Sequence, residues 1–129
     1  MQRYFIDHLA SPVILRQAVE LARHGSQNTA DLLARLALVD ERELYLPAGY
    51  QSMHAWCMGE LPFSDDSADR RIHAARAARR FPALFVAVAE GRLHLTAVGT
   101  LAPHLTRANS DELIAAASRK SKGKLERLL

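Results

Sequence analysis

Apolar residues recur at helical spacing through the first third of the chain. Residues 1–11 form a lead-in, and Pro12 then suits a first helical turn with Ser11 as its N-cap. The spacing predicts one helix over 12–25, which Gly25 ends, and a second helix over about 28–46, capped by Asn28 or Thr29. The apolar positions of the two helices are Ile14, Ala18, Leu21 and Ala22, then Leu32, Leu33, Leu36 and Val39. The pattern therefore predicts a two-helix N-terminal part over 12–48.

Short helical patterns follow one another from residue 49 to residue 129. Breaks rich in Pro, Gly and Ser separate helices over roughly 52–61, 64–81, 82–91, 94–105, 109–120 and 121–129. The segment "LFVAVAEGRLHLTAV" leaves a β-hairpin around Glu90 and Gly91 as an alternative. Overall the pattern favours an all-α fold, a single compact domain of seven or eight short helices. Because the last helix finishes on "ERLL" without a C-cap signal, we expect the natural chain to continue beyond it.

The segment "SDDSADRRIHAARAARRF", residues 64–81, predicts an amphipathic helix with Ser64 as its N-cap. His73, Arg76 and Arg80 fall within about 60° of one another around the helix axis, and Arg70 and Arg79 flank them. The opposite side carries Ala74, Ala75, Ala78 and Phe81. Arg71 points into this small-residue side, where it can either reach an edge or pair with an acid. The basic side is either a solvated charged face or a nucleic-acid contact.

A short helix, a tight turn and this longer basic helix have the layout of a helix-turn-helix. In that layout the first residues of the second helix read the bases. Here those residues include Asp65, Asp66 and Asp69, which phosphates would repel. The helix is therefore better suited to phosphate contact through its later arginines than to base reading.

The charge of the chain is unevenly distributed. The formal net charge is only +3, but acids gather at 40–43 and 65–69, and bases gather at 70–80 and 119–127. Lys120, Lys122 and Lys124 form the second basic patch, which is either a solvated face or a phosphate contact. Local basic clusters suit a polyanionic partner such as double-stranded DNA. No aromatic ladder accompanies either patch, which argues against single-strand stacking.

Several function classes lack their sequence signatures. Cys57 is the single cysteine, so no internal disulfide and no Cys-rich zinc site can form, and its apolar neighbours indicate a core thiol. The six histidines are scattered, which predicts no metal site. Phosphate-loop, dinucleotide and nucleophile-elbow motifs are absent. Without a bilayer-spanning apolar run or a signal-peptide layout, we expect a cytoplasmic protein with no membrane partner.

From about residue 28 onward the chain resembles the helical N-terminal region found ahead of HNH endonuclease domains in a large bacterial family. The resemblance rests on a G-Y-x-S-x-x-x-[WY]-C helix, "RIHAARAARRFP", "GRLHLTAV", "LAPHLTRAN" and "KSK". The matching residues are Gly49, Tyr50, Ser52, Trp56, Cys57, Ile72, Ala74 to Pro82, Gly91, Leu93, Leu95, Thr96, Leu101 to Thr106, Asn109 and Lys120 to Lys122.

The resemblance implies a nuclease domain downstream, in which a His activates water and a divalent metal polarises the phosphate. No residue of this chain matches that domain, so we expect no catalytic residue, no metal site and no cofactor here. The resulting hypothesis is a non-catalytic DNA-binding or positioning module of an HNH-type endonuclease. Its phosphate contacts would be Arg70, His73, Arg76, Arg79, Arg80, Lys120, Lys122 and Lys124.

Two alternatives come from other classes of protein. One is a protein-interaction or dimerisation module, whose alanine-rich helices and apolar "PALFVAVA" would dock a partner protein or a second copy. The other is a helix-turn-helix transcriptional regulator, which would require sequence-specific binding at spaced half-sites.

Overall fold

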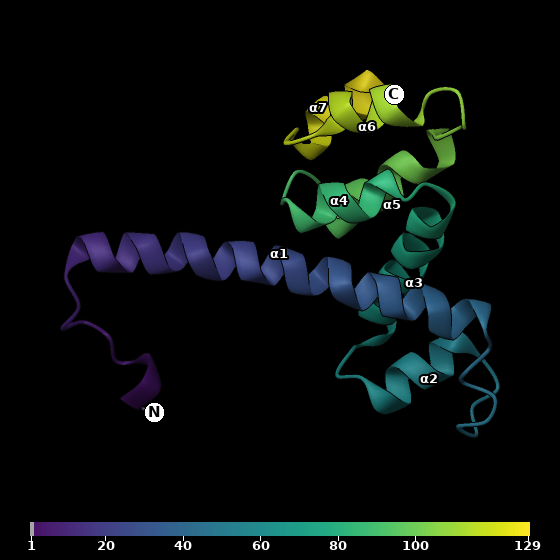
Figure 1. The fold of residues 1–129 in the computed structure, drawn as a ribbon, viewed down its shortest axis with the longest axis horizontal. Helices are drawn as coiled ribbons and strands as arrows, with labels where there is room; N and C mark the ends of the chain where they lie inside the picture. Colours follow the sequence, from purple (N-terminus) through teal and green to yellow (C-terminus); the bar gives the residue numbers. More distant parts are fainter. Residues whose placement is uncertain (1) are drawn as a thin grey trace.

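A computed structural model describes residues 2–129 (Figure 1). Helices are the only regular elements within this range, which confirms the all-α prediction. The elements are η1 (Gln2–Tyr4), α1 (Ser11–Glu41), α2 (Met53–Glu60), α3 (Asp65–Arg80), α4 (Ala83–Ala89), α5 (Leu95–Leu101), η2 (Ala102–His104), α6 (Ser110–Ala117) and α7 (Lys122–Leu128). The hairpin alternative is wrong, because α4 and α5 are helices joined by a turn in which Gly91 has φ +73°.

The predicted break at Gly25 is also wrong, because α1 continues through it as one helix of 31 residues. A glycine inside a helix costs only about 1 kcal/mol relative to alanine, and it ends a helix only where the backbone turns to positive φ. The expected cap at Thr29 lies inside α1, where its hydroxyl donates to the Gly25 carbonyl at 2.9 Å. Ser11 is likewise the first helical residue, and the N-cap position belongs to Ala10.

The cap at Ser64 is confirmed, since its hydroxyl oxygen accepts from the Ser67 N–H at 3.3 Å. The alanine side of α3 is buried, with Ala74, Ala75 and Ala78 each about 1% exposed. Within residues 2–129, Arg71 forms no ion pair with an acid. It donates to the Ser67 hydroxyl at 2.8 Å and lies over the Phe63 ring, 4.3 Å from its centroid. Small side chains thus let α3 approach its neighbours closely.

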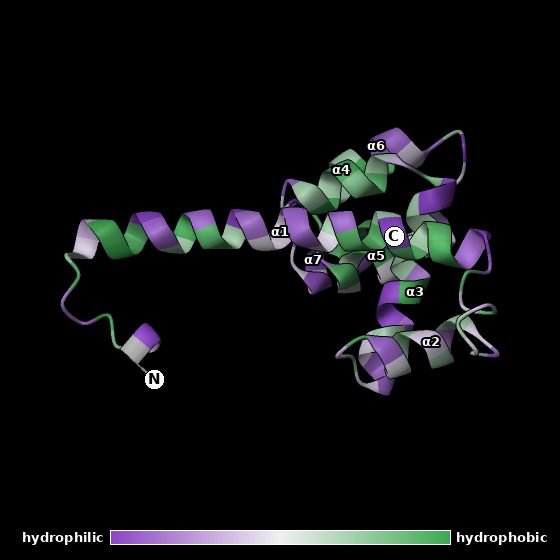
Figure 2. Ribbon diagram, turned by 60° about the horizontal axis from the view of Figure 1, so that its bottom comes forward, coloured by the Kyte–Doolittle hydropathy of each residue, from purple (hydrophilic) through white to green (hydrophobic). Residues whose placement is uncertain are grey.

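α3 is the centre of the folded body. It crosses the C-terminal half of α1 and separates α2 on one side from α4 to α7 on the other (Figures 1 and 2). α4 packs on α1, α5 packs on α3, and α6 and α7 cover α4 and α5. The largest buried side chains are Leu33, Leu36, Leu84, Leu101 and Leu125, with Val98 and Cys57.

The N-terminal half of α1 projects away from this body (Figures 1 and 2). No α1 residue before Ala30 is buried, and Leu15 and Leu21 are both 69% exposed. Within the described residues, no helix combines the length and apolar character that crossing a membrane requires.

Candidate nucleic-acid interface

The basic side predicted for α3 lies on the surface. Arg70, His73, Arg76, Arg79 and Arg80 are all exposed, and the alanines behind them are buried. Packing of the small-residue side against α1 and α5 therefore fixes which side of α3 faces solvent.

Two of these five side chains are held by carboxylates at the end of α1. Arg76 donates two hydrogen bonds to Asp40, both at 2.9 Å, and Arg79 lies 3.2 Å from a Glu41 carboxylate oxygen. The hydrogen bonds and charge of Arg76 lower the pKa of Asp40, although partial burial opposes the shift. The same hydrogen bonds raise the pKa of Arg76. Arg76 and Arg79 join α3 to α1, and a phosphate would have to displace these carboxylates to reach them.

The other three predicted residues of α3 have no carboxylate partner within the described part of the chain. Arg70, His73 and Arg80 form no ion pair there, and the Arg80 guanidinium lies 5.2 Å from the centroid of the neighbouring Phe81 ring. The two guanidinium groups and the imidazole are therefore open to solvent, and no carboxylate of the described residues would compete with a phosphate for them.

The second basic patch forms part of a cavity of about 540 Å³ between the α4–α5 turn and the α6–α7 linker. Its cationic or protonatable lining residues are Arg92, His94, Arg119, Lys120 and Lys122. Lys124, the third predicted lysine of this patch, is exposed nearby on α7 but does not line the cavity. Among the described residues, no acidic side chain lines the cavity, so its interior is electropositive. We call it the basic cavity.

Hydrogen bonds hold the two walls of the basic cavity together. Arg92 bonds the Glu90 carboxylate at 2.7 Å and the Ser118 hydroxyl at 3.0 Å, which ties the α4–α5 turn to the end of α6. The backbone N–H of Arg119 donates to the Arg92 carbonyl at 2.7 Å. The backbone of Arg119 has φ +62°, a conformation that residues other than glycine seldom adopt. The cavity is thus shaped by bonds within the protein.

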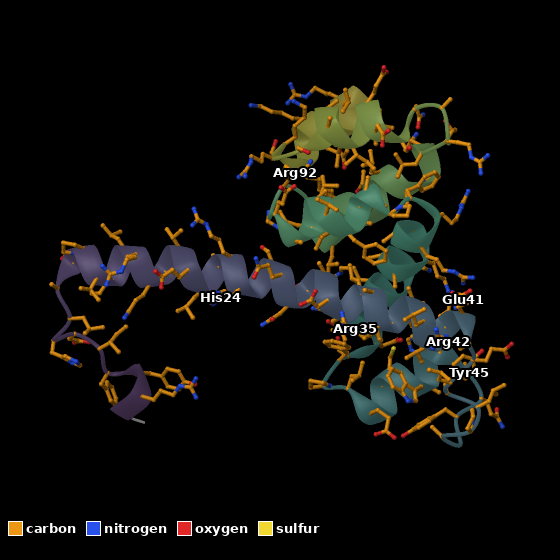
Figure 3. All side chains as sticks on the ribbon, viewed as in Figure 1. His24, Arg35, Glu41, Arg42, Tyr45 and Arg92 are labelled. Atoms are coloured by element: carbon orange, nitrogen blue, oxygen red, sulfur yellow. The ribbon has the colours of Figure 1, made fainter. Side chains whose placement is uncertain are left out.

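The basic cavity and the α3–α1 ion pairs lie on different sides of the body. Figure 3 shows Arg92 at one edge, well apart from Glu41 and Arg42 at the end of α1. No α3 residue lines the cavity. The two predicted basic patches are therefore separate surfaces, and sequence position alone did not reveal this.

A cluster of His54, Asp65 and Asp69 was missed by the sequence prediction. The two ring nitrogens of His54 lie 2.8 Å from an Asp65 oxygen and 2.9 Å from an Asp69 oxygen. Both contacts are hydrogen bonds only when both nitrogens carry protons, as in the imidazolium form. These three groups are the one set of potential metal-ligand residues found in the described chain. These contacts connect α2 to the first two turns of α3.

Cys57 is fully buried, which agrees with its interpretation as a core thiol. Burial raises the pKa of this thiol, and the nearby Asp40 charge raises it further. A thiol is nucleophilic as its thiolate, so this environment disfavours reactivity.

Comparisons of the chain with protein families, with curated proteins and with solved structures found no match. The resemblance to the region ahead of HNH nucleases therefore rests on the sequence motifs alone and stays a hypothesis.

Proposed function

We propose that this chain is a non-catalytic DNA-binding module, and that it positions duplex DNA for an HNH-type endonuclease domain. The binding is electrostatic: cationic side chains contact backbone phosphates, and no base is read. The observation that carries the proposal is that Arg119, Lys120 and Lys122 line one cavity, and that no acidic residue in the described part of the chain lines it.

The five basic residues of α3 differ in how readily they can contact phosphate. Arg70, His73 and Arg80 are exposed and unpaired within the described residues, so they meet phosphate without losing an ion pair. Arg76 and Arg79 contact phosphate only by exchanging Asp40 and Glu41 for it. The acids in the first turn of α3 also repel phosphate, which favours the later part of the helix as the contact.

The test is fluorescence anisotropy of a labelled random duplex at 50–200 mM salt, with the salt range chosen to resolve counterion release. We expect affinity to fall steeply as salt rises. Lys120→Glu combined with Lys122→Glu should weaken binding and reduce the slope of log K against log salt by about 1.8, if each lysine neutralises one phosphate.

The matched control combines Arg35→Glu with Arg42→Glu, which makes the same change in net charge on the far side of the body (Figure 3). This control should lose much less affinity than the lysine variant. Equal losses in the two variants would mean that net charge, and not the basic cavity, controls binding. No binding of the unchanged protein at 50 mM salt would refute the proposed function.

A second candidate, a dimerisation module, is favoured by the projecting half of α1. Leu15, Ala18, Val19 and Ala22 continue the stripe by which Leu33, Leu36 and Ala37 pack into the body. Within the described residues nothing covers this continuation. Sedimentation should then show a dimer whose formation does not depend on salt, and Leu15→Lys with Val19→Lys should make the protein monomeric. A monomer at every concentration would reject this candidate.

A further inference from the structure

We propose that the basic cavity binds a phosphomonoester, such as the 5′-phosphate at a DNA end, in preference to the phosphodiesters within a strand. This inference rests on the proposed function in one respect, namely that the ligand is a nucleic acid. The class of ligand follows from the shape, charge and lining of the cavity.

The shape of the cavity suits an end and not a continuous backbone. An internal phosphate lies on the convex surface of a duplex and is bonded to sugars on both sides, so it cannot enter a concave site deeply. A volume of about 540 Å³ falls within the range of small-molecule sites and exceeds what one phosphate group needs. It leaves room for the sugar or base that carries the phosphate.

The charge of the cavity favours the monoester. A phosphomonoester carries about −1.5 to −2 at pH 7, whereas a backbone phosphodiester carries about −1. Arg119, Lys120 and Lys122 line the cavity and have no carboxylate partner among the described residues. Arg92 is already paired with Glu90, so the positive charge available to a ligand comes mainly from the α6–α7 linker and the start of α7.

The remaining lining gives the cavity a polar and an apolar part. The Ser121 oxygen accepts the Lys124 N–H at 3.3 Å, which leaves the Ser121 O–H free to donate to a phosphate oxygen. Ala97, which is half-buried, supplies apolar surface for a sugar or a base, and Leu125 lies buried behind it at the cavity wall. A bound nucleotide would place its phosphate at the cationic α6–α7 linker and its nucleoside against α5 and α7.

Two hydrogen bonds within the protein connect the walls of the cavity. The Arg92–Ser118 bond and the Arg119 N–H to Arg92 carbonyl bond join the two sides. A site that is already ordered loses less conformational entropy on binding, which favours a small ligand.

The experiment compares two DNA hairpins that differ only in a 5′-phosphate or a 5′-hydroxyl, by anisotropy at one salt concentration. We expect the phosphorylated hairpin to bind at least tenfold more tightly. Lys122→Gln with Arg119→Gln should abolish that preference, whereas Arg35→Gln with Arg42→Gln should keep it. Both pairs alter exposed side chains, and thermal melting checks that each variant folds.

A second measurement titrates dAMP, deoxyadenosine and inorganic phosphate into ¹⁵N-labelled protein. The dAMP should shift the amide signals of Gly91, Arg119 and Ser121, and deoxyadenosine should not. Shifts with inorganic phosphate equal to those with dAMP would support a phosphate site that ignores the nucleoside.

The two proposals fail separately. Equal affinity for both hairpins together with silent dAMP titrations overturns the phosphomonoester site, even if salt-dependent duplex binding keeps the proposed function. Binding of dAMP in the absence of any hairpin binding supports the site and refutes the DNA-binding function.

Discussion

The paired hydrogen bonds between Asp40 and Arg76 should stabilise the fold measurably, because they connect the end of α1 to the middle of α3. The side chain of Asp40 is 17% exposed and that of Arg76 is 52% exposed, with both bonds at 2.9 Å. Exposed ion pairs contribute about 0–1 kcal/mol, and breaking a buried one costs about 3–5 kcal/mol. For this intermediate case we expect Asp40→Asn to lower the free energy of unfolding by about 1–2 kcal/mol.

The assay is urea unfolding followed by circular dichroism, with thermal melting beside it. A loss of this size corresponds to a fall in Tm of about 4–8 °C for a chain of this length. Asp31→Asn is the matched control, because Asp31 and Arg35 are both more than 70% exposed and their charged atoms lie 4.0 Å apart. The control should change stability by less than about 0.5 kcal/mol. A double-mutant cycle with Arg76→Gln should return a coupling of about 1 kcal/mol.

The dependence on pH gives an independent check. Because Arg76 lowers the pKa of Asp40, the contribution of this carboxylate is fully present above its unfolded pKa of about 3.9 and is lost as pH falls through the lower folded value. The stability gap between the unchanged protein and Asp40→Asn should be constant near neutral pH and should close in acid. Equal stability of the two proteins at pH 7, or a gap that persists at pH 2, would refute the reasoning.

Three further predictions concern the core and one turn. Leu84→Ala should cost about 2–5 kcal/mol by urea unfolding, because Leu84 is 0% exposed, whereas Val86→Ala on the same helix, at 54% exposed, should cost far less; similar losses would contradict the assigned faces of α4. Gly91→Ala should cost about 1–2 kcal/mol in the same assay, since φ +73° strains any L-residue, and an unchanged midpoint would argue against this turn. Cys57 should react with a thiol reagent at pH 8 only after urea unfolds the chain, and rapid labelling of the folded protein would show that the thiol is accessible.

Local signals predicted most of the helices. Ser64 accepts an N–H group at the start of α3 as predicted, and the alanine side of α3 is buried as its spacing indicated. These features depend on neighbours within four residues, which sequence spacing shows directly. The prediction of a helix end at Gly25 was wrong because a glycine can lie inside a helix or end it. Its φ decides between the two, and the residue type alone does not determine φ.

The candidate sites depended on pairings that spacing does not show. Arg76 and Asp40 are 36 residues apart, and Arg92 and Ser118 are 26 apart. His54 meets Asp65 and Asp69 only because α2 packs on α3. The sequence therefore predicted which residues are cationic and exposed, but not which are already neutralised. The basic cavity was half predicted: Lys120, Lys122 and the basic stretch that begins at Arg119 were identified, whereas Arg92 and His94 were not.

Because α1 continues through Gly25 without a break, the number of residues in the helix sets the position of its N-terminal half relative to the body. The 31 residues of α1 connect its buried C-terminal half to its exposed N-terminal half. Each residue adds about 1.5 Å to the length of the helix and about 100° of rotation around its axis. Whatever binds the free end is therefore held at a set distance and angle from the body. Inserting one residue between Leu21 and Gly25 would rotate Leu15 and Leu21 by about 100° around the helix axis and leave the body unchanged. Inserting seven residues there would nearly restore their direction and move them about 10 Å farther from the body. The geometry of any assembly through α1 is thus set by counting residues.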